Sequence, residues 1–183
     1  MRVISGTAKG RVLFAPKTRA IRPATDKVKE ALFNILGSVE GTRVLDLFAG
    51  SGSVAIEALS RGAVLAVFVD DLPEALRLIR RNLEACGFLE KSRIVKGRIP
   101  SILSRIRVDH PFHYVFVDPP YDQGLLTPTM EKLITYKLID AQTWVIIEHS
   151  PREMPDPPGF NLIDRRQYGQ TFLSFFQEQP QCL

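Results

Sequence analysis

Two short stretches of the sequence contain residue types that could do chemistry. In the first, Asp46 stands four residues before Gly50-Ser51-Gly52, between an apolar run and a helical pattern. A strand, a glycine turn and a helix start in that order form a site for a nucleotide-like ligand. Glycine lets the backbone approach such a ligand closely, and the helix start offers unpaired N–H groups. We therefore expect cofactor contacts from this stretch, namely from Asp46, Phe48, Ala49, Gly50, Ser51 and Gly52.

The acids around this turn indicate which cofactor it binds. The turn matches the dinucleotide fingerprint G-x-G-x-x-A, so a nicotinamide-dependent oxidoreductase is one alternative. Asp46 would face the pyrophosphate of a dinucleotide unfavourably, but it would favour a ligand that has a positive centre and no phosphate. S-adenosylmethionine has a sulfonium, an ammonium group and two ribose hydroxyls, and Asp70 can accept hydrogen bonds from both hydroxyls. We expect S-adenosylmethionine as the cofactor.

The second stretch is Asp118-Pro119-Pro120-Tyr121, which follows the apolar run 114–117. Because proline has no backbone N–H, the two prolines end strand pairing and the chain leaves the sheet there. The Asp118 carboxylate and the Pro119 carbonyl could accept both N–H bonds of an exocyclic amine, and Tyr121 could stack on the flipped base. Methyl transfer from a sulfonium to this amine would depend on positioning and electrostatics, with Asp118 taking the released proton. We expect Asp118, Pro119 and Tyr121 as the catalytic residues.

The elements that must position these residues alternate along the chain. Sequence patterns predict strands over 43–47, 65–70, 93–96, 113–118 and 143–149, and helices over 53–61, 73–85, 99–106 and 125–136. This alternation predicts an α/β, Rossmann-like, mostly parallel sheet that is covered on both faces. A C-terminal antiparallel hairpin over 160–167 and 171–177 would distinguish it from a plain dinucleotide fold. The first and fourth strands should be neighbours, so that Asp118 faces the glycine turn.

Positive charge is concentrated in the N-terminal part of the chain. Residues 1–29 contain eight basic side chains and one acid, whereas the rest of the chain contains 16 basic and 19 acidic residues. This segregation predicts a polyanionic partner, with a solvated charged arm as the alternative. Sequence patterns predict a small β-hairpin with Lys9 and Arg11 at its tip, and then an amphipathic helix that ends at Gly37. We expect a basic extension over 1–20 and a methyltransferase domain over 21–183.

Composition excludes several other classes of protein. Apolar residues make up 45% of the chain and charged residues 24%, as is ordinary for a globular protein. No apolar run reaches membrane-spanning length, and the N-terminus has no signal-peptide pattern. The two cysteines, Cys86 and Cys182, suit a reducing compartment and have no metal-like neighbours. We expect a cytoplasmic protein without a metal and, because no heptad pattern is present, a monomer.

Single residues outside these stretches have simpler interpretations. His149 ends the fifth predicted strand near the expected crevice rim, where we expect a surface histidine, with a role in substrate binding as the alternative. Trp144 should pack against the core. Arg77, Arg80 and Arg81 should form the solvated face of a helix.

Together, the two stretches make the sequence resemble S-adenosylmethionine-dependent amino-methyltransferases. The run from Arg22 to Leu36 and the opening Ile4-Ser5-Gly6 with Lys9-Gly10-Arg11 are similar to the RsmD family, the bacterial 16S rRNA guanine-N2 methyltransferases. The Arg-Pro-x-Thr-Asp motif at 22–26 is specific to this family. The Asp-Pro-Pro-Tyr motif is shared with adenine-N6 and glutamine-amide methyltransferases. Methylation of adenine N6 or of a protein amide therefore stays an alternative.

The resemblance implies a substrate and further site residues. The substrate would be the N2 amine of a flipped guanine in 16S rRNA, either free or in a 30S assembly intermediate. Arg98 stands where the family often has an acid that meets adenine, so we expect backbone groups near Ile99 to bind adenine. The expected cofactor-binding residues at these strand ends are Asp70, Asp71, Arg98 and Ile99. Because Arg98 replaces the family's acid, a non-catalytic RNA-binding module stays an alternative function for the protein. The implied RNA contacts are Lys9, Arg11, Arg19, Arg22 and Thr25.

Overall fold

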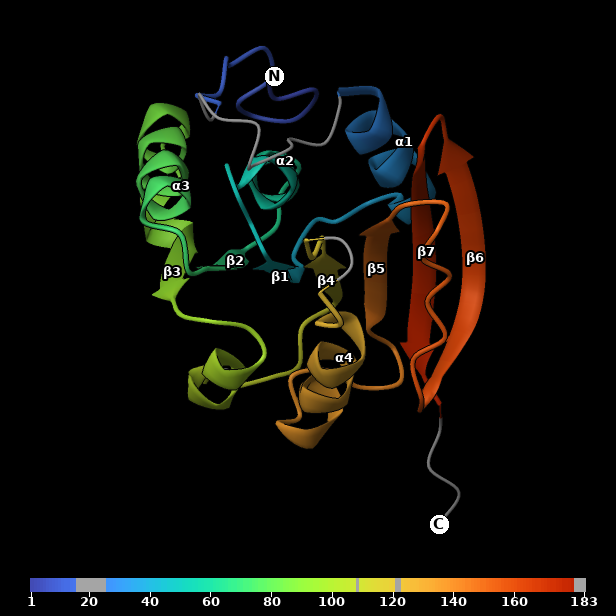
Figure 1. Cartoon of the computed structure of the whole chain (residues 1–183). Helices are drawn as coiled ribbons and strands as arrows, with labels where there is room; N and C mark the ends of the chain where they lie inside the picture. Colours follow the sequence, from blue (N-terminus) through green and yellow to red (C-terminus); the bar gives the residue numbers. More distant parts are fainter. Residues whose placement is uncertain (16–25, 108, 121–122, 180–183) are drawn as a thin grey trace.

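The structure, a computed structural model, describes residues 1–15, 26–107, 109–120 and 123–179. These residues form a seven-stranded sheet in the order β3-β2-β1-β4-β5-β7-β6 (Figure 1). The strands are β1 (Arg43–Leu47), β2 (Leu65–Asp70), β3 (Ser92–Lys96), β4 (Tyr114–Val117), β5 (Trp144–His149), β6 (Phe160–Tyr168) and β7 (Thr171–Glu178). The first five pair in parallel, and β7 lies antiparallel between β5 and β6. The predicted mostly parallel sheet with a C-terminal antiparallel hairpin is confirmed.

Helices cover both faces of this sheet. They are α1 (Asp26–Leu36), α2 (Ser53–Ser60), α3 (Pro73–Cys86), α4 (Leu126–Thr135) and two 3-10 helices, η1 (Leu89–Lys91) and η2 (Ser101–Arg105). The first three helices lie on one face, and η2 and α4 lie on the other (Figure 1). Each face therefore has its own apolar core, and the carboxyl ends of the parallel strands lie at one edge between them.

One predicted helix is much shorter than expected. The pattern over 99–106 predicted a full helical segment, but η2 covers five residues, and its hydrogen bonds span three residues instead of four. Pro100 explains the difference, because it cannot donate a backbone hydrogen bond and it disfavours helical backbone at Ile99. The apolar side chains Leu103 and Ile106 are still buried under the sheet. The pattern was therefore correct about burial and wrong about the helix.

The N-terminal segment packs tightly onto α2. The predicted hairpin is reduced to a single antiparallel bridge between Arg2 and Val12. Backbone donors that would otherwise pair two strands are used elsewhere, because Ile4 N and Ser5 N donate to the Glu57 carboxylate at 2.7 and 2.9 Å. At Gly6, where φ is +81°, a Cβ atom would lie 1.7 Å from the Ser60 carbonyl oxygen. Only glycine permits this close approach.

Membrane-spanning length is not reached by any apolar helix within the described part of the chain.

Candidate active site

Asp46 lies at the centre of the sheet's carboxyl edge. In the register of β1, it is level with Phe68 of β2 and Phe116 of β4, and its exposed fraction is 6%. Its carboxyl accepts one long hydrogen bond, 3.4 Å from Ala55 N at the start of α2. The pKa of Asp46 is raised to about 8, chiefly by burial and also by the nearby Asp70 charge, while the hydrogen bond from Ala55 opposes the shift. A buried carboxyl with so little compensation suits a ligand that carries positive charge.

The glycine turn has the unusual backbone that the sequence suggested. Phe48, Gly50 and Gly52 all have left-handed φ values, of 60°, 56° and 75°. At Gly52, a Cβ atom would also come within 3.0 Å of the Phe68 ring and 3.3 Å of Ile79. Conformation and space therefore both require glycine where the turn enters α2.

Asp70 holds the glycine turn in place. Its Oδ2 accepts a hydrogen bond from Gly50 N at 2.9 Å, and its Oδ1 accepts one from Leu72 N at 2.9 Å. Burial raises the pKa of Asp70, although these two backbone donors oppose the shift. Because each carboxylate oxygen can accept about two hydrogen bonds, the side chain retains capacity for ligand hydroxyls. The contact with Gly50 is a structural role that sequence patterns did not predict.

The other residues expected around the cofactor lie at the ends of β2 and β3. Gly97 N donates to the Asp70 carbonyl at 3.0 Å, which holds these strand ends together. Arg98 Nε is 3.9 Å from Asp71 Oδ2, with 86% and 48% of the two side chains exposed. The Ile99 side chain is buried in the core under the sheet. Of this group, Asp71 and Arg98 are therefore the side chains that face solvent.

Asp118 lies beside the glycine turn, as the strand order predicted. Val117 pairs with Leu47 in the β1–β4 register, and Asp118 N is 3.5 Å from the Leu47 carbonyl. The Asp118 side chain is half-buried, Pro119 is buried and Pro120 is exposed. The acids of the two sequence motifs thus lie at the carboxyl ends of neighbouring strands, Asp46 within β1 and Asp118 directly after β4. Four predicted site residues lie outside the described part of the chain, namely Tyr121, Arg19, Arg22 and Thr25.

The described part of the N-terminal extension forms a basic surface next to α3. Lys9 and Arg11 are both exposed, as expected for RNA contacts. They line a groove of about 600 Å³ together with Thr7, Ala8, Gly10, Val12, Phe14 and Ala85. The Arg81 guanidinium lies 3.4 Å from the centre of the Phe14 ring, so Arg81 packs on the extension and is not simply solvated.

Asn82 connects the extension to the glycine turn, a role that the sequence interpretation missed. The residue is completely buried. Its side chain accepts a hydrogen bond from Phe14 N at 2.7 Å and donates to the Phe14 and Ser51 carbonyls at 3.0 and 2.9 Å. An amide side chain between Ile79 and Leu83 on the apolar face of α3 is the signal that could have identified it.

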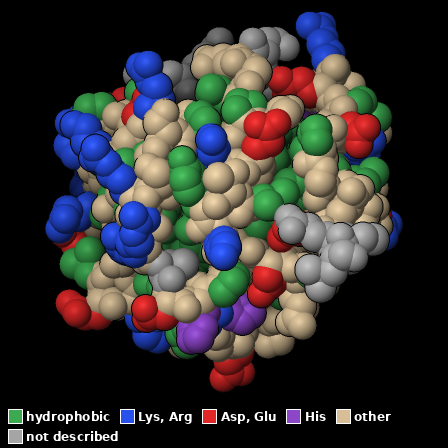
Figure 2. Space-filling model, turned by 90° about the horizontal axis from the view of Figure 1, so that it is seen from below, with side chains coloured by type: hydrophobic (Ala, Val, Ile, Leu, Met, Phe, Trp, Pro, Cys, Tyr) green, Lys and Arg blue, Asp and Glu red, His purple; other side chains and the backbone are tan. Residues whose placement is uncertain are grey.

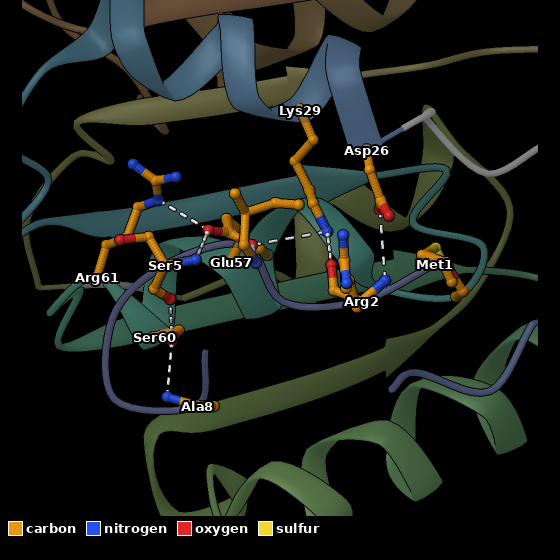
Figure 3. Close-up of polar contacts among 12 residues, drawn as sticks. Met1, Arg2, Ser5, Ala8, Asp26, Lys29, Glu57, Ser60 and Arg61 are labelled. Atoms are coloured by element: carbon orange, nitrogen blue, oxygen red, sulfur yellow. Dashed lines mark hydrogen bonds and ion pairs between the residues drawn. The ribbon is translucent and has the colours of Figure 1, made fainter. Parts of the chain in front are cut away.

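Lys29 is a structural residue and does not form part of the basic surface. It was counted with the positive arm, but Lys29 and Glu57 are both completely buried, with Nζ 3.6 Å from Oε2 (Figure 3). Lys29 Nζ also donates to the Arg2 carbonyl at 2.7 Å, and Arg61 Nε donates to Glu57 at 2.8 Å. Burial lowers the Lys29 pKa, and the Glu57 charge opposes that shift. This network joins the extension, α1 and α2.

His149 is buried, so the expectation of a surface histidine is wrong. Its exposed fraction is 1%, and it stacks on Phe172 because β7 pairs with β5 at this position. Nδ1 lies 2.9 Å from the Ser150 carbonyl, which can only accept, and Nε2 lies 2.7 Å from Ser174 Oγ. The network therefore assigns the proton to Nδ1 of a neutral ring, and burial lowers the His149 pKa. Trp144 packs against Phe175, as expected.

Within the residues that the structure describes, no group of three or more His, Cys, Asp or Glu side chains could hold a metal ion.

Comparisons with known proteins agree with this geometry. A protein-family model described as "Conserved hypothetical protein 95" matches residues 1–177. "Ribosomal RNA small subunit methyltransferase D" of Escherichia coli K12, or RsmD, is 32% identical over 184 residues, covering 99% of this chain and 91% of the relative. The chain belongs to the RsmD family. The resemblance found in the sequence is confirmed.

Two further relatives support the assignment to the RsmD family. The Bacillus subtilis protein named "Putative rRNA methyltransferase YlbH" is 34% identical over 183 residues, covering 98% of this chain and all of the relative. The solved structure of "Putative methyltransferase yhhF from Escherichia coli" has a TM-score of 0.86 at 31% identity and covers 99% of both chains. Together with the sheet order, these similarities establish a class I methyltransferase fold.

Proposed function

We propose that this protein transfers a methyl group from S-adenosylmethionine to the exocyclic N2 amine of a guanine in small-subunit ribosomal RNA. The relatives are named methyltransferases, and two of those names specify rRNA. The observation that carries the proposal is the position of Asp118 beside the end of β1, the strand that carries Asp46 and leads into the glycine turn. In this arrangement, a carboxylate that could accept hydrogen bonds from the substrate amine would lie next to a site for a positively charged cofactor.

The residues at the carboxyl ends of β1 and β2 fit this cofactor. Asp46 is buried, has one long hydrogen bond from a described residue and has a raised pKa, so a sulfonium or ammonium group nearby would favour its ionised form. Asp70 would accept hydrogen bonds from the ribose hydroxyls while still holding Gly50. A dinucleotide would instead bring its pyrophosphate towards Asp46, which argues against an oxidoreductase. We propose adenine contacts from Asp71 and from the backbone near Ile99.

Asp118 and Pro119 would bind the guanine amine. The bound cofactor supplies an electrophilic methyl group. The Asp118 carboxylate and the Pro119 carbonyl would each accept one N–H bond, which leaves the nitrogen lone pair directed at the methyl carbon. The new C–N bond forms as the C–S bond breaks, the sulfur keeps the electron pair, and Asp118 accepts the proton that the amine loses. Tyr121 would stack on the flipped base.

The basic extension would contact the RNA. Lys9 and Arg11 are exposed on it, and Arg19, Arg22 and Thr25 follow along the chain. We propose residues 1–20 as an RNA-binding extension of a methyltransferase domain over 21–183, acting as a monomer on 16S rRNA or a 30S assembly intermediate. Because phosphate contacts dominate such binding, affinity should fall steeply with salt.

Mass mapping of the labelled nucleoside tests the proposed function. The protein is incubated with labelled S-adenosylmethionine and either 16S rRNA or partly assembled subunits. Label in guanine N2 supports the proposal, whereas label in adenine or protein supports an alternative amine and overturns the guanine assignment. Asp118→Ala should reduce transfer more than about 100-fold while the Kd for the cofactor is kept. Full activity in this variant would exclude the role given to Asp118.

A further inference from the structure

A second positive region lies at the edge of the sheet. Between residues 91 and 107, the sequence has six basic residues and no acidic residue. The chain-wide charge count conceals this segment, because the sequence outside the N-terminal arm is net acidic. The β3-edge cluster consists of Lys91, Arg93, Lys96, Arg98, Arg105 and Arg107, all of them exposed.

This cluster lies along an open edge of the sheet. β3 is the terminal strand in the strand order, so its outer edge has no strand beside it among the described residues. Figure 2 shows Lys and Arg side chains gathered on the side of the molecule that carries β3 and η2 in Figure 1. Arg98 marks one end of the cluster, at the carboxyl edge of the sheet beside Asp71. The cluster therefore begins next to the candidate active site and continues away from it along β3.

Backbone contacts hold two of these arginines close together. Arg93 Nη1 donates to the Arg107 carbonyl at 2.9 Å, and Arg107 Nη1 donates to the Ser104 carbonyl. Neither guanidinium has a carboxylate partner within the described residues, and the ion pair of the cluster among these residues is the exposed contact of 3.9 Å between Arg98 Nε and Asp71 Oδ2. Like charges placed side by side repel one another, so the cluster favours a partner that brings negative charge. A guanidinium has five N–H donors, and these carbonyl contacts use few of them.

The helix α3 separates the cluster from the basic extension. α3 lies between the extension and β3 (Figure 1). Its exposed face carries Arg77 and Arg80, and Arg81 packs on the extension. Positive side chains therefore follow one path from the extension across α3 to the edge of β3. A path of this length suits an extended polyanion better than a small anion.

We propose that the β3-edge cluster binds the phosphate backbone of the substrate RNA, as a second contact beyond the basic extension. Within it, Arg98 contacts RNA and does not bind the adenine of the cofactor. The inference rests on the proposed function, because it assumes an RNA substrate. It adds to that function that the protein contacts RNA along the β3 edge of the sheet, beside the active site.

A matched pair of triple variants tests the cluster. Lys91, Lys96 and Arg105 make no side-chain hydrogen bond or ion pair with the described residues, so their replacement by Gln should leave the Tm unchanged. The control removes the same charge elsewhere, as Lys132→Gln in α4, Lys137→Gln two residues beyond α4 and Arg166→Gln in β6. Affinity for a 16S rRNA transcript is measured by anisotropy over a range of salt concentrations, and methylation kinetics are measured in parallel.

The cluster variant should bind the transcript about 10-fold to 100-fold more weakly at physiological salt, and the slope of log K against log salt should fall by about 2. Its KM for RNA should rise while kcat and the cofactor Kd stay constant, and the control should match wild type. If both triple variants have the same RNA affinity and the same salt slope while wild type methylates RNA, the further inference is wrong and the proposed function is unaffected. Absence of RNA methylation by wild type overturns the proposed function instead.

Arg98→Gln separates the two assignments for that side chain. Weaker RNA binding with an unchanged cofactor Kd supports the inference. Weaker cofactor binding with unchanged RNA binding would instead assign Arg98 to the cofactor site.

Discussion

Two buried carboxyl groups beside α2 have opposite surroundings. Glu57 is surrounded by positive partners, because Lys29 and Arg61 lie within ion-pair distance and two backbone N–H groups also donate to it. Asp46 receives one long hydrogen bond, from Ala55 N, and has no cation among the described residues. The fold supplies the counter-charge for the acid that joins its parts. It gives Asp46 no such partner among the described residues, as we would expect of an acid whose counter-charge comes from the proposed cofactor.

Glu57→Ala should show the largest effect on stability. The substitution leaves the buried Lys29 without its ionised partner and removes the acceptor for Ile4 N and Ser5 N. We expect a loss of about 3–5 kcal/mol in the free energy of unfolding, measured by urea denaturation. The double variant Lys29→Met/Glu57→Leu should recover part of this loss, since it removes both charges. A loss below 1 kcal/mol for Glu57→Ala would show that the network contributes little.

Asp46→Asn should affect the ligand and not the fold. The amide has nearly the same shape and can still accept from Ala55 N, but it cannot offset a positive charge. We expect cofactor affinity to fall on the order of 100-fold, measured by calorimetry, because a hydrogen bond to a charged group contributes about 1.5–3 kcal/mol. Asp164→Asn, at an exposed ion pair on β6, is the control. Unchanged affinity in Asp46→Asn would contradict the role of Asp46.

Asn82→Ala should have an intermediate effect on stability. It leaves Phe14 N without a partner and removes two hydrogen bonds from buried carbonyls, which we expect to cost about 1–3 kcal/mol. Residues 1–15 should become more accessible to limited proteolysis than the remainder of the chain. Uniform protection against proteolysis across both regions would show that the amide does not hold the extension.

The pH dependence of stability should also reflect the buried Asp46 carboxyl. Because the pKa of Asp46 is about 8 in the folded chain, against an ordinary value of 3.8, the folded state keeps a proton that the unfolded chain releases. Stability should therefore fall as pH rises from about 4 to about 8 and then level off. A Tm profile of wild type against Asp46→Asn isolates this contribution. The variant should be the more stable protein at pH 9, with a smaller difference at pH 5.

Sequence reasoning succeeded where the signal was local. Apolar runs bounded by turns located β1 and β2 to the residue, and rules for parallel sheets then placed Asp118 beside the glycine turn. Composition and spacing were enough for these conclusions because each strand is short and apolar and has an acid at or next to its carboxyl end.

Prediction was incomplete where a role depends on contacts between distant segments. Lys29 has the same appearance in the sequence as any other lysine of the basic arm, and only packing against Glu57 shows that it is buried. His149 was misplaced for a similar reason, since β7 covers it from 25 residues further along the chain. The net charge of the sequence after residue 29 also hides the concentration of basic residues in the segment 91–107.

The bonds of Asn82 have a consequence for how the two substrates bind. One side chain fixes both the backbone of the proposed RNA-binding extension and a carbonyl of the glycine turn, so we expect a ligand that rearranges one of these segments to affect the other. Thermodynamic linkage makes such an effect reciprocal: if RNA tightens cofactor binding by some factor, the cofactor must tighten RNA binding by the same factor. We therefore expect the order in which substrate and cofactor bind to depend on their concentrations, and Asn82→Ala to uncouple the two binding events.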